Sequence, residues 1–127
     1  MLGSIMLGKL SHKIIRLLSL PYSTGTQIWL SKSNIEHMTS KHPGAYAIYG
    51  KDIPLIISSP EYVGISPKDG SIEFVRLNQL NGDYVKVAVR SSGNGILFIR
   101  SIYILNSTRA INFIKNGQLK KVYERTD

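Results

Sequence analysis

The chain has 127 residues, a length that fits a single domain of about 100 to 200 residues. Its composition, 43% hydrophobic and 19% charged, excludes an intrinsically disordered chain, and the absence of cysteine excludes disulfides, thiol nucleophiles and thiolate metal sites. Sixteen Lys and Arg against eight Asp and Glu give a formal net charge of +8, which attracts polyanions such as nucleic acid or an anionic membrane.

The N-terminal stretch is apolar but interrupted by basic residues. It contains no uninterrupted apolar run of the about 20 residues that a membrane-spanning helix needs, and its charges lie inside the apolar stretch, where a signal peptide would not have them. The spacing of Leu10, Ile14 and Leu17 predicts an amphipathic helix over residues 7–20. We therefore expect residues 1–25 to be an N-terminal helix and linker, packed on the domain or binding a membrane surface or a partner.

The main domain is expected to span residues 26–127 and to begin with a strand over 26–31. A helix over 34–41 follows. Ser33 and Glu36 have the spacing of a capping box, in which each side chain satisfies a backbone N–H of the first helical turn. The proline at position 43 then ends the helix, because the residue before a proline is pushed away from helical angles.

Beyond this helix, a second short helix is predicted over 51–60, with Pro54 in its first turn and three isoleucines facing inward. The hydrophobic period then changes to two, and clusters of Gly, Asn, Asp or Pro separate four strand-like runs, at residues 61–66, 71–77, 83–91 and 95–105. A last helix over 106–117, with a Ser or Asn cap and apolar Ala110, Ile111 and Ile114, precedes an edge strand over 118–123. The predicted fold class is α+β, with N-terminal helices, a twisted antiparallel β-sheet of about four to five strands, and a C-terminal helix.

Side-chain alternation along the last two strands separates polar groups from the core. In "DYVKVAVRS", Lys86 and Arg90 lie on the face opposite three valines. In "ILFIRSIYIL", Ser101 and Tyr103 lie side by side, two residues apart, whereas Arg100 points to the other face if the strand is regular. A hydroxyl and a phenol on one strand can reach the same ligand.

The helix before these strands carries His37 and Lys41 at positions i and i+4, and His42 follows it. Each residue alone has an ordinary explanation, such as a solvated surface or a charged histidine at a helix C-terminus. Together their types suit metal-free RNA cleavage, which needs a base for the ribose 2′-hydroxyl, an acid for the leaving 5′-oxygen and cations for the phosphorane. No carboxylate cluster or Gly-rich phosphate loop competes, so we expect no metal ion and no other cofactor.

The order of the segments "SNIEHMTSKHP", "DIPLIISSPEYV", "DYVKVAVRSS", "ILFIRSIYIL" and "STRAINFIKNGQL", between Ile28 and Val122, resembles the phage-borne Barnase, EndoU, colicin and RelE-like nucleases. The resemblance implies a metal-independent ribonuclease of α+β fold. By position it implies three catalytic residues, His37, Ser101 and Tyr103, with substrate binding by Lys41, Lys86, Arg90 and Arg100. We add His42 to the expected substrate-binding residues, because it follows directly on the helix that carries His37 and Lys41.

The leading hypothesis is a bacterial or prophage toxin that cleaves tRNA or other RNA by 2′-hydroxyl attack and leaves a 2′,3′-cyclic phosphate. Its site of action would be cytoplasmic, with delivery as a secreted toxin domain as one route, and its partner an acidic immunity protein or antitoxin that covers the basic cleft. Two alternatives stay open: a non-catalytic nucleic-acid-binding module on the same fold, and a protein-interaction domain. Binding of nucleic acid without cleavage would favour the binding module. Failure to bind nucleic acid even at low salt would favour the protein-interaction domain.

Overall fold

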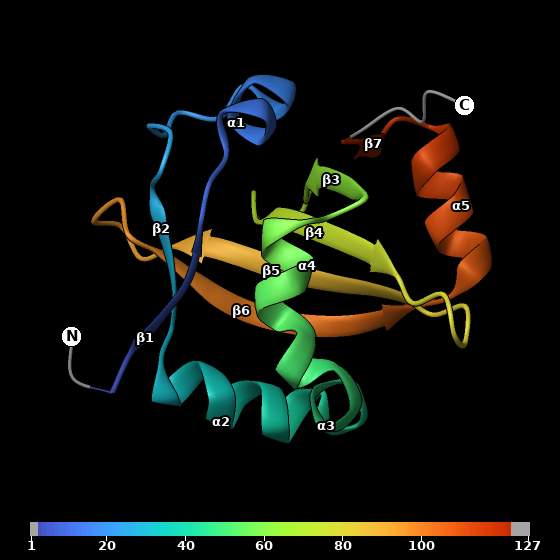
Figure 1. The fold of residues 1–127 in the computed structure, drawn as a ribbon, viewed down its shortest axis with the longest axis horizontal. Helices are drawn as coiled ribbons and strands as arrows, with labels where there is room; N and C mark the ends of the chain where they lie inside the picture. Colours follow the sequence, from blue (N-terminus) through green and yellow to red (C-terminus); the bar gives the residue numbers. More distant parts are fainter. Residues whose placement is uncertain (1–2, 123–127) are drawn as a thin grey trace.

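A mixed β-sheet organises residues 3–122, which are the part of the chain that the computed structural model describes (Figure 1). Within these residues the sheet has seven strands, in the spatial order β1-β2-β6-β5-β4-β3-β7. The strands are β1 (Ile5–Lys9), β2 (Gln27–Leu30), β3 (Tyr62–Ile65), β4 (Ile72–Leu77), β5 (Tyr84–Ser91), β6 (Leu97–Leu105) and β7 (Leu119–Lys121). The helices are α1 (His12–Leu18), α2 (Lys32–Lys41), α3 (Pro43–Tyr49), the 3-10 turn η1 (Gly50–Asp52), α4 (Ile53–Ser58) and α5 (Ser107–Lys115).

The second half of the chain folds as predicted. Strands β3, β4, β5 and β6 pair in succession as an antiparallel meander, α5 follows, and β7 adds to the free edge of β3. The short turns between the strands leave no room for a crossover connection, so each strand pairs with the one before it. The last predicted strand extends one residue beyond the described part of the chain, at Tyr123.

The expectation of an antiparallel sheet of about four to five strands is wrong in two respects. Within the described residues the sheet has seven strands, and one pair of strands is parallel. Strand β2 pairs in parallel with β6, with Ile28 beside Leu97, and β1 pairs with the outer edge of β2. The N-terminal helices are also not all placed before the sheet as expected, since β1 precedes α1 and β2 lies between α1 and α2. Pairing between segments some seventy residues apart has no signature in local sequence pattern, which is why the α+β class is confirmed and the sheet composition is not.

The predicted helix over residues 7–20 is wrong in its first half, where residues 5–9 form β1. Helix α1 begins only after Ser11, whose hydroxyl accepts a hydrogen bond from the Ile14 backbone N–H at 3.2 Å. Gly8 weakens a helix in this segment, and pairing with β2 satisfies the backbone groups instead. The helical spacing itself holds within α1, where Ile14 and Leu18 are buried, and Leu10, just before the helix, is buried as well.

Helix α2 starts two residues earlier than predicted. Its capping box consists of Ser31 and Asn34, not Ser33 and Glu36: the Ser31 hydroxyl accepts from the Asn34 N–H at 3.1 Å, and the Asn34 side chain accepts from the Ser31 N–H at 3.2 Å. The helix ends at Lys41 as predicted, but Pro43 at once begins α3, which the sequence interpretation missed. A proline that ends one helix is also well suited to the first turn of the next, and the joint between the two helices is His42.

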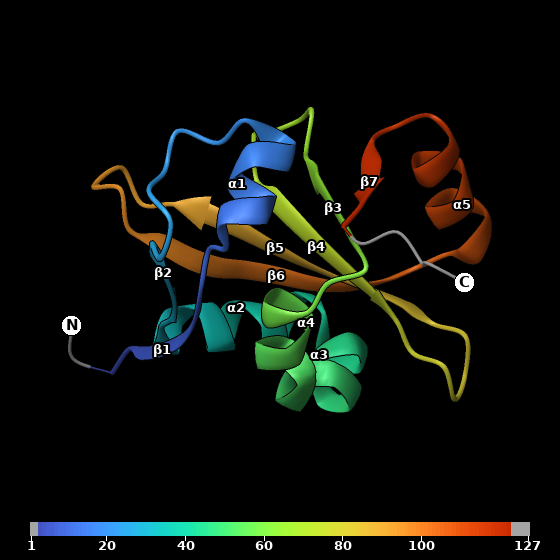
Figure 2. The same cartoon turned by 45° about the horizontal axis from the view of Figure 1, so that its top comes forward.

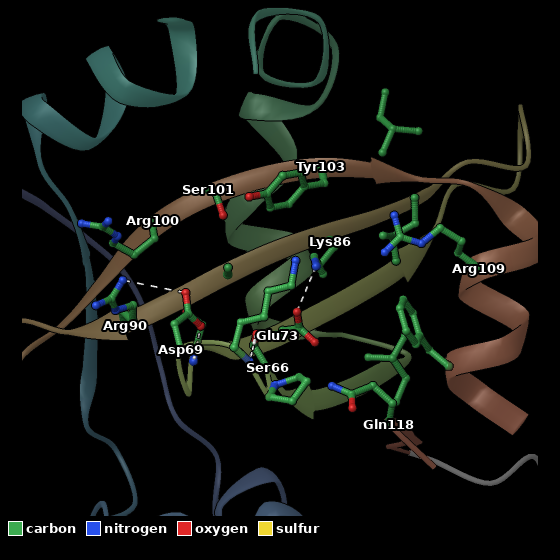
Figure 3. A pocket seen from close by; sticks show the side chains of 18 of the residues that line it. Ser66, Asp69, Glu73, Lys86, Arg90, Arg100, Ser101, Tyr103, Arg109 and Gln118 are labelled. Atoms are coloured by element: carbon green, nitrogen blue, oxygen red, sulfur yellow. Dashed lines mark hydrogen bonds and ion pairs between the residues drawn. The ribbon is translucent and has the colours of Figure 1, made fainter. Parts of the chain in front are cut away.

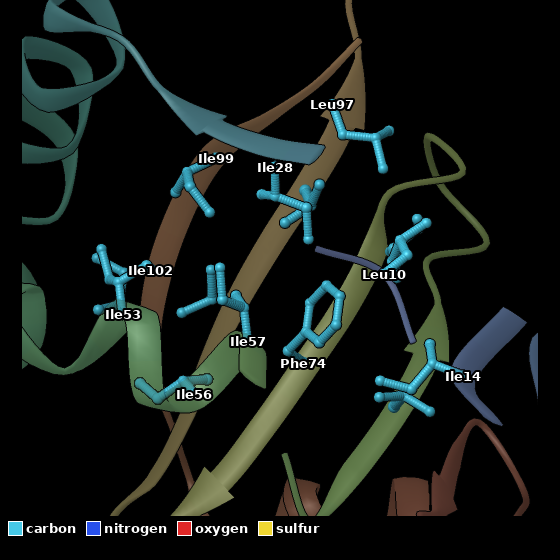
Figure 4. Close-up of a cluster of buried hydrophobic side chains, with 14 of the residues drawn as sticks. Leu10, Ile14, Ile28, Ile53, Ile56, Ile57, Phe74, Leu97, Ile99 and Ile102 are labelled. Atoms are coloured by element: carbon cyan, nitrogen blue, oxygen red, sulfur yellow. The ribbon is translucent and has the colours of Figure 1, made fainter. Parts of the chain in front are cut away.

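One face of the sheet carries the main hydrophobic core, covered by α1 and α4 (Figures 2 and 4). The inward isoleucines of α4 are buried as predicted and pack with side chains of β4, β5 and β6, among them Phe74 and Ile102, both 0% exposed. Helices α2 and α3 lie along β6. In residues 3–122, no helix has the length and apolar character that crossing a bilayer requires.

Within the described residues, the opposite face of the sheet is covered at one end, where α5 packs against β7 and its neighbours. There Val75, Leu105, Ala110 and Leu119 form a second, smaller core. Ala110 is buried, and Phe113 and Ile114 pack partly buried against this core, whereas Ile111 is 42% exposed. We call the rest of this face the open face; over β4, β5 and β6 it carries mainly polar side chains.

Candidate functional site

The open face is hollowed by a cavity of about 600 Å³ (Figure 3). Its floor consists of side chains from β4, β5 and β6, and its walls are α5, the β3–β4 loop and the side chain of His37 on α2. Five lysine or arginine side chains line it against two carboxylates. These cations are Lys68, Lys86, Arg90, Arg100 and Arg109, and the carboxylates are Asp69 and Glu73. The lining therefore has a net positive charge, which favours an anionic ligand.

Two ion pairs hold cations of β5 in place. Lys86 Nζ lies 2.9 Å from Glu73 Oε2, and both side chains are largely buried, at 18% and 10% exposed. Arg90 lies 3.8 Å from an Asp69 carboxylate oxygen. The pKa of Asp69 is lowered, chiefly by hydrogen bonds from Ser71 and also by Arg90. Both carboxylates thus orient cations across the floor, as the dashed lines in Figure 3 show.

A β-bulge places Arg100 in the cavity. The β5–β6 register pairs Ala88 with Ser101 and Val89 with Ile99, so Arg100 is an extra residue on β6. The regular alternation assumed from the sequence is therefore wrong at this point: Ile99 faces the core, whereas Ser101 lies on the open face with Arg100 beside it. Bulges commonly re-aim side chains next to functional sites, and here the bulge adds a guanidinium to the cavity.

The rings of His37, His42 and Tyr103 form a cluster at the edge of the cavity nearest α2. The ring centroids of His42 and Tyr103 are 4.3 Å apart, edge to face, and those of His37 and His42 are 6.2 Å apart. Lys86 Nζ lies 4.8 Å from the centre of the Tyr103 ring, on which it makes a cation–π contact. Partial burial, and then the charge of His37, lower the pKa of His42 and favour its neutral form.

Six of the eight residues singled out from the sequence line the cavity: His37, Lys86, Arg90, Arg100, Ser101 and Tyr103. The other two lie beside it. His42 contacts the Tyr103 ring from the joint between α2 and α3, and Lys41 is exposed at the end of α2, outside the lining that the described residues form. Ser101 is 7% exposed and Tyr103 is 37% exposed, so the phenol is the more accessible of the two.

Sequence reasoning missed Glu73, Arg109 and Phe113 in this cavity, and each had a signal. Alternation along "SIEFVRL" places Glu73 on the face opposite Ile72 and Phe74. Arg109 and Phe113 are at i and i+4 on α5, and the guanidinium carbon lies 5.6 Å from the ring centre. Within residues 3–122, no three His, Cys, Asp or Glu side chains are grouped so that they could bind a metal ion.

A family model described as phage-Barnase-EndoU-ColicinE5/D-RelE like nuclease3 matches residues 5–112, which include β1 and all eight candidate site residues. No curated protein and no solved structure matches the chain.

Proposed function

Because the chain belongs to the family of phage Barnase, EndoU, colicin E5/D and RelE-like nucleases, we propose that the cavity on its open face is the active site of a metal-independent endoribonuclease. Membership makes the protein a nuclease and its substrate a nucleic acid. The choice of RNA rests on one observation: an imidazole, a phenol, a hydroxyl and three cationic side chains, two of them held by ion pairs, converge on a single cavity. These groups are sufficient for attack by a ribose 2′-hydroxyl, which DNA lacks.

In the proposed reaction a general base takes the proton of the 2′-hydroxyl, and the 2′-oxygen attacks phosphorus. The bond from phosphorus to the 5′-oxygen breaks as a general acid gives that oxygen a proton, leaving a 2′,3′-cyclic phosphate and a 5′-hydroxyl. His37 acts as the base, since an imidazole can accept a proton near neutral pH, and Tyr103 is its complement as acid or phosphate ligand. His42, packed edge to face on the Tyr103 ring, positions the phenol.

The cations stabilise the charge that grows on the phosphate oxygens in the transition state. Lys86, Arg90 and Arg100 supply the positive charge, and the Ser101 hydroxyl donates a hydrogen bond to a phosphate oxygen. Glu73 and Asp69 hold the first two cations before substrate binds, so little reorganisation is needed during the reaction.

We extend the proposal to the biological role: a bacterial or prophage toxin that acts on tRNA or other RNA in the cytoplasm, with secretion as one route of delivery. Its support is the colicin and phage kinship in the family description and the net charge of +8. An acidic immunity protein or antitoxin would associate rapidly with such a surface. If no inhibitor co-purifies from the native host, the toxin role fails while the nuclease proposal stands.

The decisive experiment is incubation of the protein with total bacterial RNA in excess EDTA, followed by gel analysis and end-group mapping. We expect fragments that end in 2′,3′-cyclic phosphate. His37→Ala should slow their appearance by about 10²- to 10⁴-fold, the usual contribution of a general acid or base. His12→Ala is the matched control, because His12 is exposed on α1 and lies beside the Thr24 hydroxyl, away from the cavity.

Other outcomes separate the alternatives. Cleavage that appears only when a divalent cation is restored would contradict metal independence. Equal rates for His37→Ala and the parent would refute the assigned site. Salt-sensitive RNA binding with no cleavage under any condition would favour the non-catalytic nucleic-acid-binding module.

A further inference from the structure

The cavity continues along the open face into a second hollow of about 540 Å³, which we call the side groove. Arg90 and Arg100 line both spaces, so they mark the passage from one to the other. Beyond these arginines the side groove is lined by Phe98 of β6 and by polar side chains at the start of α2, among them Ser33 and Asn34. The open face therefore has a longer concave surface than the catalytic chemistry requires.

The strand register places two aromatic residues in a row next to these arginines. Arg90 of β5 is paired with Phe98 of β6, and Phe98 with Trp29 of β2. Residues paired across neighbouring strands point to the same face of a sheet, so all three lie on the open face. Their chain neighbours Ile28 and Leu97 are completely buried in the core on the opposite face.

Neither the Trp29 ring nor the Phe98 ring packs into a hydrophobic core. Trp29 and Phe98 are only partly buried, and neither belongs to the hydrophobic core clusters or to the apolar side chains packed on them. The row continues to Met6 on β1, which is paired with Trp29 and is 40% exposed. Partly exposed rings on a sheet, beside guanidinium groups, have the chemistry that single-stranded nucleic acid requires: bases stack on the rings and phosphates bind the cations.

We propose that Trp29, Phe98, Arg90 and Arg100 form a stacking platform for the single-stranded RNA that flanks the scissile phosphate. The substrate is then an extended single strand, and neither a dinucleotide nor a continuous duplex uses the whole surface, since the bases of a duplex are stacked on each other and cannot lie on the rings. This inference rests on the proposed function for the cleavage step, but binding to the platform is measurable without cleavage.

Trp29 is the only tryptophan of the chain, so its fluorescence reports occupancy of the platform directly. The probes are 2′-O-methyl RNA oligonucleotides, which lack the attacking hydroxyl and stay intact during titration. We expect an octanucleotide to quench Trp29 and to bind at least roughly tenfold more tightly than a dinucleotide, whose affinity is obtained by calorimetry. A blunt duplex of the same sequence should leave Trp29 unquenched.

Single-residue variants test which side chains of the platform contribute to RNA binding. Phe98→Leu should weaken octanucleotide binding roughly tenfold, the loss typical of one stacked base, and leave dinucleotide binding unchanged. Arg100→Gln should reduce the slope of log affinity against log salt concentration by about 0.7, the value for one phosphate contact on a single strand. Arg16→Gln, on the exposed side of α1, is the matched control and should change neither quantity.

The possible failures are distinguishable. Equal affinities for the two lengths, absence of Trp29 quenching, or equal quenching by the duplex would overturn the platform, and RNA cleavage by the parent would still support the nuclease. Conversely, length-dependent quenching of Trp29 whose affinity falls roughly tenfold in Phe98→Leu would establish the platform, even if no RNA were ever cleaved and the proposed function failed. Octanucleotide binding that is unchanged in Phe98→Leu, with its fold verified by circular dichroism, would also overturn the platform.

Discussion

The two faces of the sheet differ although the same strands form both. On β6, Ile102 is 0% exposed against α4 and the core, whereas the next residue, Tyr103, is 37% exposed in the cavity. On β5, three valines face the core and Lys86 and Arg90 face the cavity. The comparison indicates that the two faces have different roles. Hydrophobic burial on the core face stabilises the fold, and the open face, which contributes less to stability, can hold charged and reactive groups. Substitutions on the two faces should therefore affect different measurements.

The largest expected effect is on stability, from the core face. Phe74 is completely buried on β4, and Phe74→Ala removes a ring that the neighbouring side chains cannot replace. We expect a loss of about 3 to 5 kcal/mol in the free energy of unfolding, measured by urea denaturation. A loss below about 1 kcal/mol would contradict the assignment of this face as the main core.

Substitutions on the open face should change the rate of RNA cleavage more than the free energy of unfolding. Tyr103→Phe removes only the phenolic hydroxyl, and we expect RNA cleavage to fall roughly 10²-fold, as for loss of a proton donor. The free energy of unfolding should change by no more than about 0.5 kcal/mol, because the side chain is partly exposed. Tyr46→Phe on α3 is the control and should cleave at the parental rate. Unchanged cleavage by Tyr103→Phe would remove the phenol from the mechanism.

The ion pair between Lys86 and Glu73 is where the division between the faces is least strict. Both groups are largely desolvated, so Lys86→Met leaves a carboxylate without its cation. We expect a loss of about 1 to 3 kcal/mol in the free energy of unfolding. The double variant Lys86→Met, Glu73→Gln should recover much of that loss without recovering cleavage. If the double variant is no more stable than Lys86→Met, the pair does not explain the loss.

The smallest effect concerns His42 and pH. Its pKa in the folded protein lies below the ordinary value of 6.5, because of burial and of His37. Below pH 6.5 the unfolded chain therefore binds more protons here than the folded chain, so this contribution to stability is present above that pH and is lost as the pH falls through 6.5 toward the folded pKa. Urea midpoints between about pH 5 and about pH 7 should show a shallower dependence in His42→Gln than in the parent. Identical pH profiles would contradict the shift.

The residues of the candidate site illustrate how far local pattern reaches. Period-two alternation was sufficient to place Lys86 and Arg90 opposite the buried valines, and the same rule applied to β4 would have found Glu73. It failed on β6, where the bulge reverses the expected relation of Arg100 to Ser101. A bulge depends on how a strand matches its partner, and the sequence of one strand does not contain that match.

The sequence by itself determined the α+β class, the four-strand meander, most helix positions and the polar residue types that line the candidate site, because these depend on hydrophobic period, turn residues and side-chain chemistry within short segments. Only the tertiary structure decided that β1 and β2 join the sheet through parallel pairing with β6, that His42 at the α2–α3 joint meets Tyr103, and that the arginines of β5 and β6 connect the cavity to the side groove. These features arise from backbone pairing and packing between distant segments, whose free energy depends on the whole fold and not on any one stretch of residues.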